Sequence, residues 1–109
     1  MGETRFVRHI ALFRWKEGAR PDPDKVAREL AAIAEGTNAL HFEAGPALGL
    51  GHPTYDFAVV ADFATAEDYL AYREEPNHRS YVNDVLRPAA ADVAAMQIAS
   101  QVSGDSRDV

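Results

Sequence analysis

The stretch RFVRHIALFRW, from Arg5 to Trp15, decides the fold. It is dense in aromatic and β-branched residues and contains no Gly or Pro, a composition typical of a long β-strand. Successive side chains of a strand point to opposite faces, and both faces of this strand are largely apolar. One face carries Val7, His9, Ala11, Phe13 and Trp15, and the other carries Phe6, Arg8, Ile10, Leu12 and Arg14. We therefore expect helices of the same subunit to cover one face and something else to cover the other.

A helix is predicted after this strand, beginning at Pro23. Asp22 followed by Pro23 has the form of an N-cap with proline at the first helical position. Apolar residues then recur at i, i+4 and i+7, and Gly36 stands where a glycine would end the helix. The apolar positions are Val26, Leu30 and Ile33.

Two strands are expected next, a short one from Leu40 to Ala44 and the strongly apolar YDFAVVADF from Tyr55 to Phe63. The run from Gly45 to Pro53 between them is rich in turn formers and is interpreted as a flexible loop at the lip of a pocket. Thr65, with Asp68 three residues further on, resembles a capping box and indicates the start of another helix.

A further helical piece and a last strand complete the pattern. Pro76 should break the preceding helix, and Asn77 can cap the next piece, which Pro88 should disrupt. Residues 92–102 are predicted to form the last strand, and the polar residues 103–109 a disordered tail.

The element order is therefore β-α-β-β-α-β, the ferredoxin-like pattern of the α+β class. It predicts a four-stranded antiparallel sheet with both helices on one face, formed by a single domain over residues 1–102. The other sheet face would have no partner within one chain. We therefore expect a homodimer in which two sheets pack face to face.

Composition excludes several classes of function. The chain has 109 residues, 11 Lys and Arg, 17 Asp and Glu, a formal charge of -6 and no Cys. The missing cysteines exclude disulfide scaffolds, thiol nucleophiles and Cys-ligated zinc. The acidic balance argues against nucleic acid as a partner, and no apolar run reaches the about 18 residues of a membrane span. We expect a soluble, cytoplasmic protein.

Several stretches resemble the stress-responsive A/B barrel family, the dimeric α/β-barrel domains. They are RHIALFRW (8–15), FEAGP (42–46), YDFAVVADF (55–63), AYREEPNH (71–78) and LRP (86–88). Together they cover nearly the whole chain apart from its tail. The resemblance implies a ferredoxin-like subunit and a dimeric α/β barrel formed by two subunits.

The resemblance also implies candidate catalytic residues. In a plant polyketide cyclase of this family, the Tyr and the last His of a Y-x-x-H-P-x-H segment form an acid/base pair, which correspond to Tyr72 and His78. Glu75 replaces the first His of that segment. His9 matches a His on the first strand of the cyclase, whereas Phe57 stands where the cyclase has another pocket His, so an identical reaction is not expected.

The residues themselves support these two candidates. An imidazole titrates near neutral pH, and His78 begins a helical piece just after a proline, where the helix dipole favours the neutral base. Tyr72 lies six residues earlier and could donate a hydrogen bond to a developing enolate. Each also has a structural alternative: His78 could close the turn through a backbone hydrogen bond, and Tyr72 could be a core aromatic residue.

Candidate substrate-binding residues come mainly from the first strand. If a cavity lies between sheet and helices, the face with His9, Ala11, Phe13 and Trp15 should line it, with the small Ala11 leaving room. A satisfied core histidine is the alternative for His9. Two more candidates are Tyr81 as pocket wall and Asp56, which could pair with a His or with Arg8 or lie in solvent.

No cofactor is indicated. The four His residues have no i,i+4 or His-x-His spacing, and no carboxylate cluster stands beside them, which argues against a metal site. The resulting hypothesis is a cofactor-independent enzyme that acts on a small carbonyl or aromatic substrate through aldol or Claisen cyclisation or isomerisation. The alternatives are a non-catalytic, stress-associated or ligand-binding homodimer and, by fold analogy, a cofactor-free monooxygenase.

Overall fold

The computed structural model describes residues 4–102. Four strands and two helical regions form two layers, in the order predicted. The elements are β1 (Thr4–Trp15), α1 (Pro23–Glu35), β2 (His41–Pro46), β3 (Phe57–Phe63), α2 (Ala66–Glu74), α3 (Pro76–Tyr81), the π-helical segment η1 (Val82–Leu86), α4 (Arg87–Ala89) and β4 (Ala90–Val102). Among these residues, no helix has both the length and the apolar character needed to cross a membrane.

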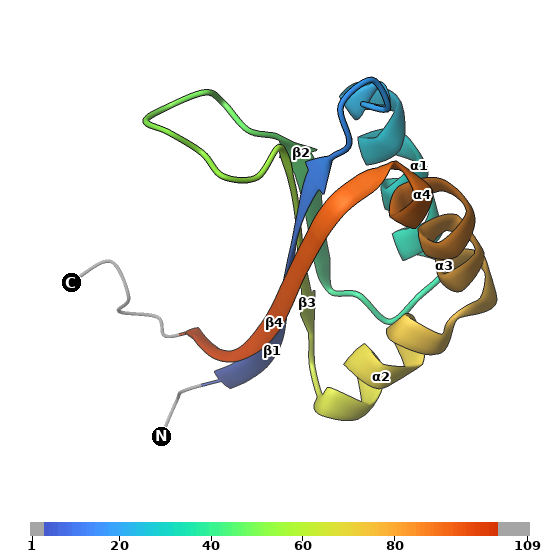
Figure 1. Cartoon of the computed structure of the whole chain (residues 1–109). Helices are drawn as coiled ribbons and strands as arrows, with labels where there is room; N and C mark the ends of the chain where they lie inside the picture. The colour runs from blue at the N-terminus through green and yellow to red at the C-terminus, as the bar shows by residue number, and fades with distance from the viewer. Residues whose placement is uncertain (1–3, 103–109) are drawn as a thin grey trace.

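The sheet is antiparallel, with strand order β2-β3-β1-β4. Figure 1 shows it nearly edge-on, with every helix on one side. In the register, His9 lies between Ala61 of β3 and Gln97 of β4. The predicted ferredoxin-like architecture is therefore confirmed.

The main core lies between the sheet and the helices. The helix-facing side of β1 contributes Ala11, Phe13 and Trp15, which pack with residues of the other elements that the period-two and helical patterns place inward. These are Val26, Leu30, Phe57, Val59 and Leu86. A second, smaller cluster contains Ala61, Phe63 and Tyr72. Burying each large apolar side chain stabilises the fold by about 1.5–3 kcal/mol.

Local capping interactions fix most helix starts as expected. The Asp22 side chain accepts a hydrogen bond from the Asp24 N–H at 3.1 Å, and Thr65 Oγ1 accepts one from the Asp68 N–H at 3.1 Å. The prediction that Asn77 caps the second helical piece is wrong. Glu75 is its N-cap, because its Oε1 accepts from the His78 N–H at 2.7 Å and the longer Glu side chain reaches across the Pro76 break.

Pro88 does not interrupt the helical run as expected. The N–H of Arg87 bonds to the carbonyl of Val82, five residues back, in the π-helical segment, and Pro88 then lies in the first turn of α4. The helical run ends at Ala89, one residue after this proline. Strand β4 follows at once, two residues earlier than predicted. The predicted disordered tail, 103–109, lies outside the described residues.

The sheet face away from the helices is apolar and uncovered in the single chain. Ile10 of β1 lies beside Val60 and Met96, and Met96 and Ile98 are 57% and 42% exposed. On the same face Arg8 makes a two-pronged ion pair with the buried Asp62, with Nε to Oδ1 at 2.7 Å and Nη2 to Oδ2 at 2.9 Å. This pairing lowers the pKa of Asp62.

Candidate active site

A cavity of about 300 Å³ lies between the sheet and the helical layer. Its walls are mainly apolar, with Ala11, Phe13, Leu30, Val59, Val82 and Leu86 among them. Six groups with polar or charged ends also line it: His9, Tyr69, Tyr72, Arg73, His78 and Arg87. An apolar chamber with a few convergent polar groups is the usual form of a small-molecule site.

Tyr72 and His78 face each other across the break between α2 and α3. Tyr72 occupies the last turns of α2, Pro76 prevents that helix from continuing, and the Glu75 cap fixes the start of α3 and so the position of His78. The two ring centroids are 4.2 Å apart, with the ring planes at 43°. The six-residue spacing therefore brings both rings into contact in one cavity.

The environment keeps His78 neutral at neutral pH. Burial lowers its pKa, and this effect exceeds the opposing effects of a hydrogen bond with the backbone of Arg73 and of the Glu75 carboxylate. Its Nδ1 atom is buried and has no hydrogen-bond partner within residues 4–102. A buried polar atom without a partner is uncommon in folded proteins.

Tyr72 is placed to donate a proton or a hydrogen bond. Burial, with a smaller effect of Tyr69, raises the pKa of the Tyr72 phenol to about 12. The phenol therefore stays protonated at neutral pH. Within the described part of the chain its side chain makes no hydrogen bond, although its ring contacts Phe63, His9 and His78. Its hydroxyl group is thus available to a ligand.

His9 forms a polar network with Gln97 and Tyr69 on one wall of the cavity. Gln97 Nε2 lies 3.0 Å from His9 Nδ1 and donates to the Tyr69 hydroxyl oxygen at 3.1 Å. Burial, together with repulsion from His78, lowers the pKa of His9 to about 4. The neutral imidazole that results can accept the Gln97 bond at Nδ1 and carry its proton on Nε2.

Three predicted site residues lie outside the lining of this cavity. Trp15 stacks on Phe13 within the core, with ring centroids 5.6 Å apart. The Tyr81 hydroxyl donates to Glu29 Oε1 on α1 at 2.8 Å, and burial and this carboxylate raise the pKa of Tyr81. His9, Ala11, Phe13, Tyr72 and His78 do line the cavity, and their roles in binding or catalysis stay predictions.

Asp56 is the third residue outside the cavity, and it pairs neither with a His nor with Arg8. Its Oδ2 accepts from the Trp15 N–H at 2.8 Å, and its Oδ1 lies 3.5 Å from Arg20 Nη2. The loop between β2 and β3 does not form a lip of this cavity, because it extends from the sheet away from the helices (Figure 1) and contributes no residue to the lining.

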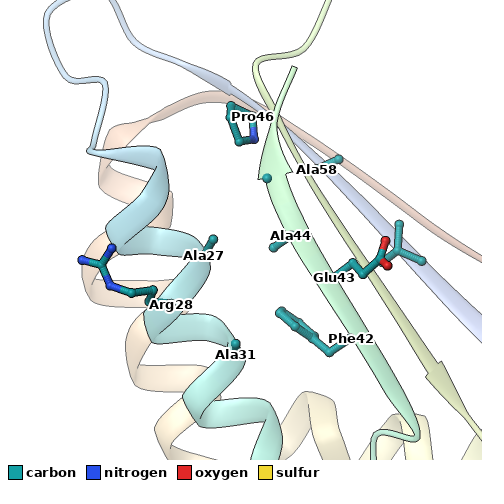
Figure 2. A pocket seen from close by; sticks show the side chains of 10 residues that line it. Ala27, Arg28, Ala31, Phe42, Glu43, Ala44, Pro46 and Ala58 are labelled. Carbon is teal, nitrogen blue, oxygen red and sulfur yellow. The ribbon is translucent and has the colours of Figure 1, made fainter. Parts of the chain in front are cut away.

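A larger groove, of about 610 Å³, runs along the edge strand β2. Figure 2 shows Ala27 and Ala31 of α1 opposite Phe42 and Ala44 of β2, whereas Glu43 points to the other side of the strand. The groove contains no His or Tyr and draws its lining from both faces of the sheet edge. It is therefore an open surface strip, whereas the candidate catalytic residues Tyr72 and His78 line the smaller cavity.

Sequence reasoning missed four polar residues around the cavity: Tyr69, Arg73, Arg87 and Gln97. Tyr69 could have been found, because it precedes Tyr72 by three residues and shares its helix face. Gln97 is found only from the β1–β4 register, and Arg87 only from the π-helical segment that turns it toward the cavity. Among residues 4–102, no group of three His, Cys, Asp or Glu side chains could hold a metal ion.

The sheet, the helices on one face and the cavity between them define a ferredoxin-like α+β domain. Comparison with protein families then assigns the chain: it belongs to the stress responsive A/B barrel domain family, whose model matches residues 7–99. Among curated proteins, none matched the chain.

Solved structures agree with this assignment. A dimeric ferredoxin-like protein of unknown function from Thermobifida fusca is 34% identical, with a TM-score of 0.78, covering 92% of this chain and 95% of that one. A Dabb family protein with a ferredoxin-like fold from Mesorhizobium loti is 20% identical, with a TM-score of 0.65 and coverage of 87% and 96%. The hydroxynitrile lyase of Passiflora edulis is 17% identical, with a TM-score of 0.74 and coverage of 87% and 93%. The last two show the shared fold.

Proposed function

We propose that the protein is a cofactor-independent enzyme that acts on a small carbonyl compound. The observation that carries this proposal is the contact between the neutral imidazole of His78 and the protonated phenol of Tyr72 in one largely apolar cavity. A neutral base beside a protonated donor is the pairing that proton abstraction next to a carbonyl requires.

In the proposed reaction, His78 takes a proton from the carbon next to the substrate carbonyl. The electron pair of that C–H bond forms the C=C bond of an enolate, the π pair of the carbonyl moves to its oxygen, and the Tyr72 hydroxyl donates a hydrogen bond to the resulting oxyanion. The enolate carbon then attacks a second carbonyl of the same molecule, and the imidazolium returns its proton to the new alkoxide in an aldol cyclisation. Returning the proton to a different carbon instead gives an isomerisation.

Resemblance to the plant polyketide cyclase supports this assignment. Tyr72 and His78 correspond to the acid/base pair of that enzyme, and they line one cavity here. Phe57 replaces another pocket His of the cyclase and is buried in the core, so we propose a different substrate. The alternative of a non-catalytic dimer expects a filled core at this junction, and a cavity that reaches both side chains favours the enzyme.

We further propose that the enzyme is a homodimer formed through the helix-free sheet face. The exposed Met96 and Ile98 side chains on this face support it, because a sheet with an apolar outer face is stabilised by packing on a second sheet. The relative from Thermobifida fusca is described as dimeric.

A thermal-shift comparison of the wild type, His78→Ala and a matched control tests the site. The control is His41→Ala, because His41 is exposed and contacts Glu43 on the sheet edge. We expect small aromatic acids, β-keto thioesters or lactones to stabilise the wild type and the control saturably, with a smaller shift in His78→Ala. Equal shifts in all three proteins, or none in the wild type, would contradict the proposal.

A further inference from the structure

The charged side chains in the lining of the cavity are basic. Arg73 and Arg87 line it, and among the described residues no Asp or Glu does. Arg73 lies in the last turn of α2, and Arg87 begins α4 after the π-helical segment, so separate elements bring the two arginines to one cavity. Both residues are exposed, which places their side chains at the rim and leaves the floor to apolar groups.

The fold makes no use of these two guanidinium groups. Three other arginines are paired with carboxylates: Arg8 with Asp62, Arg20 with Asp56, and Arg79 with Glu74. Arg14 and Arg28 also have no ion pair within residues 4–102, but they do not line the cavity. Within residues 4–102, the side chains of Arg73 and Arg87 make no hydrogen bond and no ion pair. Each guanidinium keeps its planar set of N–H donors, whose geometry matches a carboxylate or a phosphate.

The surroundings favour a carboxylate over a phosphate. Proteins commonly hold phosphate with backbone N–H groups of glycine-rich loops and helix N-termini. This cavity has no glycine in its lining, and Arg73 stands at the C-terminal end of α2, which offers no N-terminal N–H groups to a phosphate. The volume of about 300 Å³ and the apolar walls suit a compact carbon skeleton behind a single anionic group.

We propose that the cavity binds a small carboxylic acid whose carboxylate is held at the rim by Arg73 and Arg87. The placement of its carbonyl or aromatic body against Tyr72 and His78 rests on the proposed function. The carboxylate site itself stands on the two arginines. It narrows the substrate class to keto acids or aromatic acids, since their neutral amides and esters lack the charge that the rim recognises.

Calorimetric binding of benzoate and of benzamide, which has nearly the same shape without the charge, tests this site. We expect the wild type to bind benzoate about tenfold more tightly than benzamide or better, because two charge-assisted contacts are lost in the amide. The double variant Arg73→Gln/Arg87→Gln should lose this preference. The matched control is Arg79→Gln, which removes a guanidinium that pairs with Glu74 outside the cavity, and it should keep the preference.

Two results would overturn the carboxylate site: equal affinity of the wild type for both compounds, or an unchanged benzoate preference in the double variant when its unfolding curve matches that of the wild type. A third result would also overturn the carboxylate site. If inorganic phosphate competes with benzoate and binds more tightly than benzoate does, the site favours a phosphorylated ligand. His78→Ala separates this proposal from the proposed function. If only the catalytic proposal is wrong, the wild type still prefers benzoate to benzamide. If only the carboxylate site is wrong, the wild type shows no such preference, but its catalytic activity still depends on His78.

Discussion

Replacing His9 by Gln should remove most of the dependence of stability on pH between neutrality and pH 4. His9 is buried, with 9% of its surface exposed, and its pKa falls from 6.5 to about 4 in the folded state. In the unfolded chain the imidazole takes up its proton near pH 6.5, whereas in the folded protein it stays neutral down to about pH 4. Between these values the unfolded state therefore binds more protons, and stability decreases as the pH falls.

The size of the effect follows from the shift. Each pKa unit corresponds to about 1.4 kcal/mol, so the displacement of His9 gives a loss of about 3 kcal/mol at most, and about 2 kcal/mol when partial solvent contact is considered. The loss should be complete near pH 4 and absent above pH 7. Burial also lowers the pKa of His78, so His78 adds to the loss with the same sign.

Urea unfolding at fixed protein concentration, at several pH values between 4 and 7.5, measures this loss. We compare each protein with itself across pH, so any change in stability at pH 7 caused by the substitution cancels. His9→Gln should lose most of the slope, whereas His52→Gln, which alters an exposed loop histidine, should keep it. An identical pH slope in His9→Gln and the wild type would refute the reasoning.

Two further predictions concern packing. Leu86→Ala should lower the free energy of unfolding by about 2–5 kcal/mol, because Leu86 is 1% exposed between helices and sheet. Chemical denaturation measures this loss. A loss below about 1 kcal/mol would contradict the assigned core. Met96→Asp should weaken the proposed dimer by about a hundredfold or more, because twofold symmetry places two carboxylates in one apolar interface. Analytical ultracentrifugation measures the dissociation constant of the dimer. The control Leu70→Asp, on the exposed side of a helix, should leave this constant unchanged. A Met96→Asp dimer as stable as that of the wild type would place the interface elsewhere.

Local patterns were enough to predict the layers of the molecule. The alternation in β1 placed His9, Ala11 and Phe13 on the helix side, because side-chain direction in a strand has a period of two. Pro76 predicted the break that turns His78 back toward Tyr72. The direction of a strand side chain and the break of a helix at a proline depend on a few neighbouring residues, so both can be predicted from the sequence.

Contacts between distant segments were predicted less well. Gln97 meets His9 only because β4 pairs with β1 in one register, and Tyr81 turns away from the cavity because its hydroxyl group donates a hydrogen bond to Glu29 on α1. The sequence does not predict Glu75 as the N-cap, because a short polar residue such as Asn77 is the commoner type at that position. The proline at position 76 instead begins the helix, which makes the preceding residue the cap. The contacts of Gln97 and Tyr81 depend on how separate elements pack against each other, which local sequence does not reveal.

Exchange of the acidic C2 protons of acetoacetate in deuterated water, followed by NMR, tests most directly whether His78 and Tyr72 act on a carbonyl compound. We predict that the wild type accelerates exchange above the buffer rate and that His78→Ala lowers this acceleration by about a hundredfold or more, with the fold retained and His41→Ala unaffected. Exchange no faster with the wild type than with His78→Ala would contradict this prediction.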